Sequence, residues 1–443
     1  MAAVLPTPPL MSATRSSSGA VLVLVAALSL VQVAGAGTAS AKKPTPATTT
    51  TTKPTTATTL TTVAPTTTTV APTTTTTSIS APNAVYHIDP RVVSDCSKPV
   101  DAEIAAFLAS VPDGDTARFG PGQCYALDSV IVLTKRSSLT VDGNGSTFHK
   151  LTAPSVGQTS SLNGSWRVSS GSNVTIEHMI IRGSYVPPAR GTPGQGLNYE
   201  HGVALWGVQG ATVVDVSVSN VDGDCVSADP DIAAAQDPTI GGDYRLVPPT
   251  RNAVIDGLTC SGAGRHGVAA TAAQYLTIEN SEISNVQEDG VDIEIDAPAD
   301  PVLGIPSEQD NHITIANNKL HDFYFSAVAF PLGQDPDVGT IAIRNNVTTT
   351  PSDTCFAAVY AGDPRFTLGQ LDITGNTFLS LGDAIRLTQV GSGDVSGNTL
   401  IGPAPNTACY NAALPGGGYP LSTRLINSPN LTAHDNVSNG WFS

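Results

Sequence analysis

Short segments in which apolar and polar residues alternate recur along most of the chain. The phrases HGV at 266–268 and DGV at 289–291 are nearly the same and lie twenty-three residues apart. A repeat of this length predicts stacked structural units. Related segments are HGVALWG from 201, DCVSADP from 224, SAVAFPL from 326, AAVYAGD from 357 and DAIRLTQ from 383.

Other strand-like stretches precede these segments, and Asn, Gly or Asp residues separate the two kinds. Examples are VVDVSVSNV at 213–221 and LTIENSEISNV at 276–286, while no helical periodicity follows residue 110. We predict an all-β fold, a single-stranded right-handed parallel β-helix; a β-sandwich is the alternative, but it has no reason to keep this register. Asn220 and Asn285 fall in equivalent turns, where we expect a hydrogen-bonded ladder. The predicted interior column is Val203, Val226, Val268, Val291, Val328 and Ile385.

One amphipathic helix is expected, over residues 100–111 (VDAEIAAFLASV). It precedes the first strands and is placed to cover the open end of the coil stack. Residues 138–151 then form the first full turn, with a tight bend at 142–145. Insertions at 230–251 and 297–311 interrupt the repeat, and they form either the walls of a groove or plain surface loops.

The N-terminal residues predict export rather than a folded unit. An apolar run at 21–34 follows Arg15 and precedes small residues, which indicates a signal peptide over 1–41 with cleavage near Ala36 or Ala41. A retained membrane anchor is the alternative, although the run is short for a membrane span. Residues 42–81 are rich in Thr and Pro and predict a disordered linker. The domain then occupies 82–443, and we expect the mature protein to be secreted or bound to the cell envelope without membrane insertion.

The charge of the chain excludes some partners. Residues 82–443 hold 17 basic and all 37 acidic residues, a formal charge of −20. Such a domain repels nucleic acid, because phosphate binding needs Lys and Arg. It also repels anionic polymers unless metal ions intervene. We expect a polysaccharide or cell-surface glycan as the partner, and a monomeric protein.

Six cysteines in an exported chain predict disulfides. Their order suggests Cys96–Cys124, Cys225–Cys260 and Cys355–Cys409, one of the fifteen pairings that six cysteines allow. No CxxC or HExxH spacing occurs, which argues against a structural zinc site.

Polar residues form a column two positions before the stacked valines. We expect Asp224 and Asp289 to lie two coils apart, roughly 9–10 Å, with His266 between them. Two carboxyl groups about 6.5–9.5 Å apart suit inverting glycoside hydrolysis, and closer pairs suit the retaining route. A histidine between them can orient the acids or act as acid or base. The alternative is structural, because aspartates at turns often bond the backbone. The column is His201, Asp224, His266, Asp289 and Ser326.

A second acidic group follows Val291. Strand alternation directs Asp292 and Glu294 to one outer face, beside Asp289. Neighbouring like charges repel each other, so a function or a bound cation explains them better than strand stability does. Arg265 lies one coil earlier, next to Glu288, and offsets part of this charge.

The motifs GDCV (223–226), CSGAGRHG (260–267) and DGVDIEI (289–295) resemble those of the polygalacturonases, a family of pectin-hydrolysing β-helix enzymes within the pectate-lyase-like superfamily. The resemblance implies that Asp224 is a catalytic aspartate and His266 the active-site histidine. It also supports the Cys225–Cys260 disulfide.

The sequence departs from the family motifs at three places. Gly223 replaces the first aspartate of the Asp-Asp pair, and Tyr-Glu-His-Gly at 199–202 replaces the Asn-Thr-Asp-Gly motif. Asp292 and Glu294 stand where the family carries the Arg and Lys that hold the substrate carboxylate. A galacturonate carboxylate would meet two negative groups there, which argues against plain polygalacturonase activity.

Three functions remain open. The first is a polysaccharide hydrolase that needs no cofactor, with Asp224, His266 and Asp289 as catalytic residues. The second is a lyase or epimerase whose Ca²⁺ is bound by oxygen ligands from Asp229, Asp292 and Glu294. The third is a non-catalytic surface adhesin or display module. The expected substrate-binding residues are His201, Trp206, Arg265, Asp292, Glu294 and Tyr360, and Tyr244 is a further aromatic candidate.

Overall fold

The computed structural model describes most of the C-terminal four fifths of the chain. The expected signal peptide and linker lie outside the described residues and stay predictions. The described residues are 83–152, 164–186, 200–236, 240, 243–294, 310–330, 339–349, 356–361, 368–380, 384–402, 423–426, 428 and 430–439.

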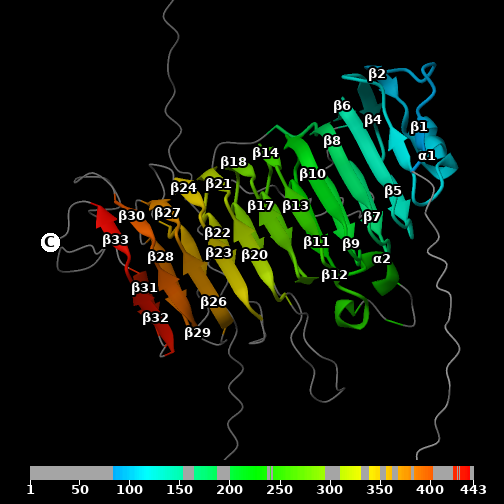
Figure 1. Cartoon of the computed structure of the whole chain (residues 1–443). Coiled ribbons are helices and arrows are strands. Elements are labelled where there is room, and N and C mark those ends of the chain that lie inside the picture. The colour runs from blue at the N-terminus through cyan, green and yellow to red at the C-terminus, as the bar shows by residue number, and fades with distance from the viewer. Residues whose placement is uncertain are drawn as a thin grey trace, which may run out of the picture. The chain divides into compact units, whose positions relative to one another are not determined.

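The described residues form a parallel β-helix in which one sheet takes one strand from each successive coil (Figure 1). We call it the site sheet, because the candidate site lies on it. Its strands, in spatial and sequence order, are β5 (Ile131–Thr134), β7 (Trp166–Ser169), β9 (Val203–Trp206), β11 (Val226–Asp229), β15 (Val268–Ala270), β19 (Val291–Ile293), β22 (Val328–Phe330), β25 (Val359–Ala361), β28 (Ile385–Thr388) and β31 (Thr423–Ile426).

The remaining long sheet bends within each coil and forms two columns of parallel strands. Three long strands run through both columns: β6 (Thr140–Lys150), β8 (Thr175–Arg182) and β10 (Thr212–Ser219). The first column also contains β1 (Val85–His87), β3 (Thr116–Arg118), β13 (Val254–Asp256), β17 (Thr277–Glu279), β20 (Ile313–Ala316), β23 (Ile341–Arg344), β26 (Leu368–Thr374), β29 (Val390–Ser396) and β32 (Leu431–His434). The second contains β2 (Asp95–Pro99), β4 (Cys124–Leu127), β14 (Thr259–Ser261), β18 (Glu282–Val286), β21 (Lys319–Phe323), β24 (Val347–Thr349), β27 (Thr377–Leu379), β30 (Thr399–Ile401) and β33 (Val437–Asn439).

The predicted valine column is confirmed by the strand register of the site sheet. Val226 pairs with Val203 on one side and with Val268 on the other, and Val268 pairs with Val291. The column continues through Val328 and Val359 to Ile385. All of these side chains are buried in one apolar interior. Stacking of identical β-branched side chains in adjacent parallel strands is therefore the basis of the repeat seen in the sequence.

A buried asparagine ladder holds the bend between the two columns in the C-terminal coils. The Asn346 side-chain oxygen accepts hydrogen bonds from the Asn318 backbone N–H at 2.9 Å and from its side-chain amide at 3.0 Å. The Asn346 amide donates in turn to Ile315 and Asn376. Asn220 and Asn285 do occupy equivalent turns, both with positive φ, but the ladder runs through a different set. Its members are Asn318, Asn346, Asn376, Asn398 and Asn436.

Helix α1 (Asp101–Ser110) covers the N-terminal end of the stack, as predicted. Ile104 and Leu108 are buried in the common core. Arg136 fastens the end of the helix, because its guanidinium donates to the carbonyl oxygens of Leu108 and Val111. The predicted bend at 142–145 is instead a bulge inside β6, since the register of β6 against β8 shifts there.

The first insertion covers part of the site sheet. It contains α2 (Ile232–Ala235) and the 3₁₀ turn η1 (Tyr244–Leu246). It ends in β12 (Thr250–Arg251), which pairs with β16 (Ala273–Gln274). The second insertion lies almost wholly outside the described residues.

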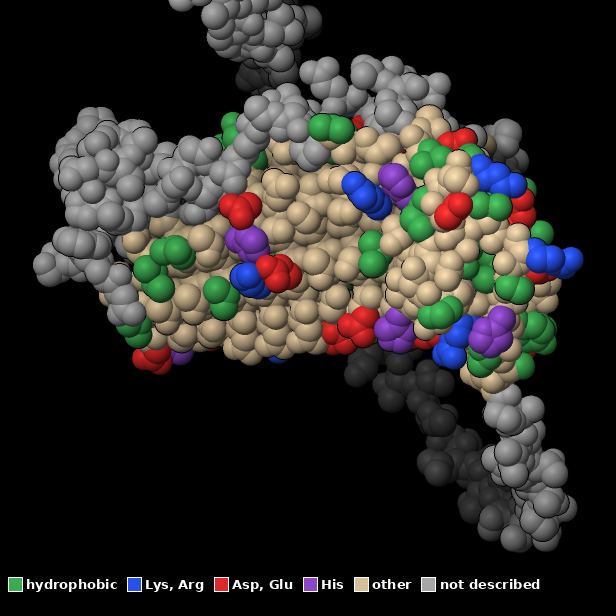
Figure 2. Space-filling model, turned by 90° about the horizontal axis from the view of Figure 1, so that it is seen from above, with side chains coloured by type: hydrophobic (Ala, Val, Ile, Leu, Met, Phe, Trp, Pro, Cys, Tyr) green, Lys and Arg blue, Asp and Glu red, His purple; other side chains and the backbone are tan. Residues whose placement is uncertain are grey.

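The structure contains two of the predicted disulfides, Cys96–Cys124 and Cys225–Cys260. The third, Cys355–Cys409, lies outside the described residues. Among the residues that the structure does describe, no helix has both the length and the apolar character needed to cross a membrane. Figure 2 shows one face of the domain, where charged side chains gather in a few separate groups.

Replacement of Asn346 by Ala should destabilise the domain by about 2–4 kcal/mol, because it leaves buried donors and an acceptor of the ladder without partners. The measurement is urea unfolding followed by circular dichroism. Thr349→Ala is the control, since Thr349 is exposed three residues further along the same coil. Equal midpoints for the two variants would show that the ladder does not contribute to stability.

Candidate functional site

The polar column before the stacked valines is a hydrogen-bonded ladder of alternating His and Asp. The Asp224 backbone N–H donates to His201 Nδ1 at 3.2 Å, and the His266 N–H donates to Asp224 Oδ1 at 3.0 Å. The Asp289 N–H donates to His266 Nδ1 at 3.2 Å, and the Ser326 N–H donates to Asp289 Oδ1 at 2.7 Å. Each side chain therefore accepts the backbone hydrogen of the next coil. The column thus bonds the backbone, as the structural alternative predicted. This bonding occupies one acceptor atom of each side chain.

A pocket of about 720 Å³ opens on the site sheet beside this ladder. One part of its lining is charged and another part is aromatic. The lining residues are Arg265, His266, Glu288, Asp289, Asp292, Glu294, Phe325, Ser326, Ala329, Phe356, Ala357, Tyr360 and Arg386.

Arg265 lies among the carboxylates of the charged part. Its guanidinium nitrogens are 3.6 Å from Glu288 Oε2, 3.5 Å from Glu294 Oε2 and 3.7 Å from Asp224 Oδ2. The side chain is mostly buried, so these ion pairs are only weakly screened by solvent. Arg265 thus neutralises part of the acidic group, as the sequence suggested for Glu288.

His266 connects the ladder to the pocket. Its Nε2 lies 3.0 Å from Glu288 Oε2 and 3.1 Å from Asp292 Oδ2. Burial alone would lower the pKa of His266, but Asp292 and Glu288 outweigh it and raise this pKa to about 10. The hydrogen bond from the Asp289 backbone to Nδ1 opposes this rise in pKa, because Nδ1 can accept it only while the ring is neutral and carries its single hydrogen on Nε2. His266 therefore acts as a donor toward the carboxylates.

Burial opposes the ionisation of Asp289 and Asp292 in the pocket. Burial raises the pKa of Asp289 to about 6 and raises the pKa of Asp292 well above its ordinary value. An oxygen of each lies within 4.8 Å of the other. Two carboxyl groups this close resist double ionisation, so the pair retains a proton at a pH where ordinary carboxyl groups have lost theirs.

Asp224 behaves differently from this pair. It is 1% exposed and is not part of the pocket lining. Burial opposes its ionisation, but Arg265 and His201 hold the pKa of Asp224 below its ordinary value. Asp224 is therefore an ionised group behind the pocket, in contact with His201 and Arg265. Its expected catalytic role stays a prediction.

Several other expected site residues lie away from the pocket. His201 is buried in the ladder. Trp206 is 1% exposed, packs against Ala204 and Ile232, and carries the Arg167 guanidinium 4.4 Å from its ring centre. This packing leaves no exposed ring face for a sugar. The side chain of Tyr244 is outside the described part of the chain.

The aromatic wall of the pocket contains two residues that the sequence did not single out. Phe325 and Phe356 pack edge to face, with ring centres 5.1 Å apart, and Phe356 is 44% exposed. Tyr360, which was expected, lies beside them in the lining. Arg386 is also new, and its guanidinium lies over the Tyr360 ring at 5.8 Å. The segments around 326 and 357 aligned with the repeat, and a search of the column positions before them would have found both phenylalanines.

Within the described part of the chain, two groups of side chains have the spacing of metal ligands. His266, Asp289 and Asp292 offer ligand atoms within 4.8 Å of one another. The expected calcium ligand Asp229 is not among them, because it accepts a hydrogen bond from Ser227 and does not line the pocket. Nothing else in the sequence identifies a calcium site, so calcium binding remains a prediction.

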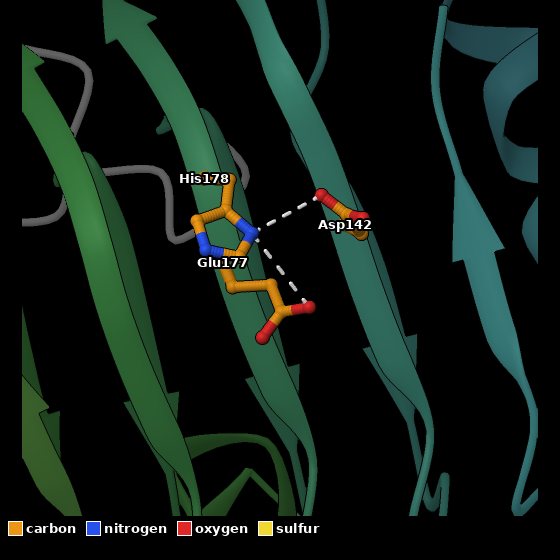
Figure 3. A group of neighbouring side chains, drawn as sticks. All are labelled: Asp142, Glu177 and His178. Atoms are coloured by element: carbon orange, nitrogen blue, oxygen red, sulfur yellow. Dashed lines mark hydrogen bonds and ion pairs between the residues drawn. The ribbon is translucent and has the colours of Figure 1, made fainter.

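The second group, Asp142, Glu177 and His178, lies on β6 and β8 of the bent sheet (Figure 3). His178 Nδ1 is 3.4 Å from Asp142 Oδ1 and 3.8 Å from Glu177 Oε1. Both Asp142 oxygens already accept hydrogen bonds, one from Arg118 and one from the Asn144 backbone. This group is therefore satisfied by its own neighbours.

Gly223, which departs from the polygalacturonase motif, has a local explanation. A Cβ atom at this position would lie 3.0 Å from His201 Nδ1 and 3.0 Å from the Glu200 carbonyl carbon. An aspartate would thus displace the His201 ring that accepts the Asp224 backbone hydrogen. The glycine at 223 therefore leaves room for the His201 ring.

Comparisons with known proteins identify the fold. No protein-family model matches the chain, and the search of curated proteins gives no match. Among solved structures, the Dettilon tailspike protein aligns over 80% of this chain and 62% of its own, with 13% identity and a TM-score of 0.51. The chain thus spans less than two thirds of that tailspike.

Two further solved proteins align at lower scores. The surface adhesin PfbA of Streptococcus pneumoniae aligns over 80% of this chain and 97% of its own, with 11% identity and a TM-score of 0.48. The family 28 exopolygalacturonase of Yersinia enterocolitica aligns over 81% and 71%, with 10% identity and a TM-score of 0.45. At these identities the comparisons establish the fold alone, a right-handed parallel β-helix, as the repeat predicted.

The raised pKa of Asp289 predicts that stability falls with rising pH. Its pKa of about 6 lies above the ordinary 3.8, so the folded state binds more protons, and the contribution is complete below about pH 4 and lost as pH rises through 6. A shift of about two units corresponds to about 3 kcal/mol. In Asp289→Asn, which keeps the acceptor for Ser326, this part of the pH dependence should vanish. Urea unfolding between pH 4 and 7 measures it.

The control for this comparison is Asp322→Asn, on the second column of the bent sheet. Asp322 has an exposed side chain and a positive φ that asparagine also tolerates. Wild type, control and Asp289→Asn with the same slope of unfolding free energy against pH would contradict the raised pKa.

Proposed function

We propose that the protein is an exported glycoside hydrolase that cleaves a polysaccharide with Asp292 and Asp289 as its carboxyl pair. The observation that carries the proposal is two neighbouring buried carboxyl groups with raised pKa in the floor of a pocket that also has an aromatic wall. Acid–base catalysis near neutral pH needs carboxyl groups with such raised pKa values. Aromatic faces are suited to pack against sugar rings.

Asp292 is the proton donor in this proposal. Its Oδ2 faces the Nε2–H of His266 at 3.1 Å, whereas its buried Oδ1 has no hydrogen-bond partner among the residues that the structure describes. The proton of the neutral acid therefore belongs on Oδ1, and the carboxyl group turns to present this proton to the substrate. In the first step Asp292 gives this proton to the glycosidic oxygen as the bond to the leaving sugar breaks.

Asp289 is the nucleophile. Its Oδ1 accepts the Ser326 backbone hydrogen, which fixes the carboxylate and leaves Oδ2 for attack on the anomeric carbon. Oxygens within 4.8 Å lie closer than the roughly 6.5–9.5 Å of inverting enzymes, so the retaining route fits. Water then cleaves the glycosyl–enzyme bond, and Asp292 takes the proton of that water. In this proposal Asp292 and Asp289 replace Asp224 and Asp289, the catalytic carboxyl pair that the sequence predicted.

Asp224 and Arg265 are positioning residues in this scheme. Asp224 accepts the His266 backbone hydrogen and lies beside Arg265, and Arg265 in turn draws Glu288 and Glu294 toward itself. This arrangement leaves His266 Nε2–H directed at Asp292. It also places several negative groups around the reacting bond, which favours an uncharged sugar at that position.

A calcium-dependent lyase is the second candidate, favoured by the spacing of His266, Asp289 and Asp292. Carboxylate oxygens are good calcium ligands, and a cation would offset the negative charge. The proton held on His266 Nε2 opposes this arrangement, because a metal would have to displace it. A lyase also yields unsaturated sugars, which absorb in the ultraviolet, and its activity would be lost with a chelator.

Incubation of the protein with a panel of polysaccharides should release reducing ends without unsaturated product and without sensitivity to chelator. Asp289→Asn and Asp292→Asn should each lower the rate by at least about 100-fold, because each removes a group that reacts with the substrate. Asp322→Asn is the matched control and should keep the wild-type rate. Retention of activity in both pocket variants would reject the assignment, and binding without turnover would support an adhesive module.

The pH dependence of kcat should be bell-shaped. Activity should fall below about pH 6 as Asp289 becomes protonated and can no longer attack, since its pKa is about 6. At higher pH the rate should fall again when Asp292 loses its proton. A rate that stays constant from pH 4 to 6 would contradict the role of Asp289 as nucleophile.

A further inference from the structure

We propose that Arg386 forms a subsite for a negatively charged substituent of the glycan, three coils from the carboxyl pair. This deepens the proposed function, on which it rests, by naming the substrate class. The glycan has an uncharged residue at Asp289 and Asp292, and it carries a carboxylate, sulfate or phosphate group several residues away.

The outer face of the site sheet changes from covered to open along one row of residues. In register, the row passes through Ala204, Ser227, Ala269, Asp292, Ala329, Tyr360 and Arg386. Every side chain in it up to Ala329 is at most 5% exposed, whereas Tyr360 is half-buried and Arg386 exposed.

The insertion accounts for the covered N-terminal end of this row. Ile232 of α2 packs on Ala204 and Trp206. Thr250, which ends the insertion, donates its hydroxyl hydrogen toward the carbonyl oxygens of Leu205 and Asp229. Among the described residues, a glycan seated on Asp289 and Asp292 therefore has room to extend along the row only toward Tyr360 and Arg386.

Arg386 differs from the other arginine of the pocket in its partners. Arg265 has three carboxylates within 3.7 Å. Within the described part of the chain, Arg386 instead has an aromatic contact, with its guanidinium 5.8 Å from the Tyr360 ring centre, and no carboxylate partner. A guanidinium with no carboxylate partner among the described residues is notable in a domain with a formal charge of −20, where acidic residues outnumber basic ones about two to one.

The chemistry of Arg386 indicates the ligand. A guanidinium presents parallel N–H donors that match the oxygens of carboxylate, sulfate and phosphate groups. The Tyr360 ring restricts the motion of the side chain and so reduces the entropy lost on binding. Three coils separate Arg386 from Asp292, about 14 Å at the spacing of parallel strands. The anionic group therefore belongs to a sugar beyond the one that is cleaved.

The test is equilibrium binding of the full-length chain to immobilised oligosaccharides in three classes: neutral, uronic-acid-containing and sulfated. The wild type should bind one anionic class at least about tenfold more tightly than neutral chains of the same length, and more weakly as salt is raised. Carboxyl-reduced and desulfated forms of the same oligosaccharides identify which group is recognised. Arg386→Gln should remove the preference while leaving affinity for neutral chains unchanged.

Arg344→Gln is the matched control, because Arg344 is an exposed arginine on strand β23 of the other sheet. Binding is measured separately from turnover, so unchanged hydrolysis in Asp289→Asn with a retained anion preference would reject the catalytic proposal and keep this one. Equal affinity of the wild type for neutral and anionic chains, no binding to any anionic chain, or an unchanged preference in Arg386→Gln would overturn it.

Discussion

The hydrogen bond between a side chain at a turn and a backbone N–H of the adjacent coil supports the rest of this structure. Strand pairing satisfies the backbone within the sheets, but the turns between them need other acceptors. Asn318 and its successors accept hydrogen bonds from the coil before them, whereas His201, Asp224, His266 and Asp289 accept from the coil after them. The two ladders therefore fix the register of neighbouring coils from opposite directions, and the pocket is built on the second.

The ladder of His201, Asp224, His266 and Asp289 also explains how buried acidic groups are tolerated. Each aspartate of the column has one oxygen satisfied by the backbone, so only the second oxygen has to be paired or protonated. For Asp224 the second oxygen faces His201 and Arg265 and the group stays ionised. For Asp289 the corresponding neighbours include other acids, and the group retains its proton more firmly. The same local structure thus gives two aspartates of opposite acidity, because their neighbours differ.

The sequence predicted what depends on periodicity and left out what depends on side-chain packing. The interior column, the cap at α1 and two disulfides follow from the spacing of apolar residues and cysteines. The proximity of His266, Asp289 and Asp292 also follows from the register. Trp206 was misjudged because α2 lies in an insertion that the repeat does not describe. Phe325 and Phe356 were missed because the residue before each column position was not considered, and Arg386 because the repeat gives no sign of which outer residues face the pocket.

The ladder of His201, Asp224, His266 and Asp289 requires only an acceptor atom at each position, and both imidazole and carboxylate provide one. The stack can therefore exchange His for Asp, or duplicate a coil that contains either, without losing its inter-coil bonds. Each such exchange changes the charge and acidity of the adjoining pocket while the scaffold persists. In this architecture a point substitution within the structural ladder changes the chemistry of the site while the hydrogen bonds that hold the fold remain.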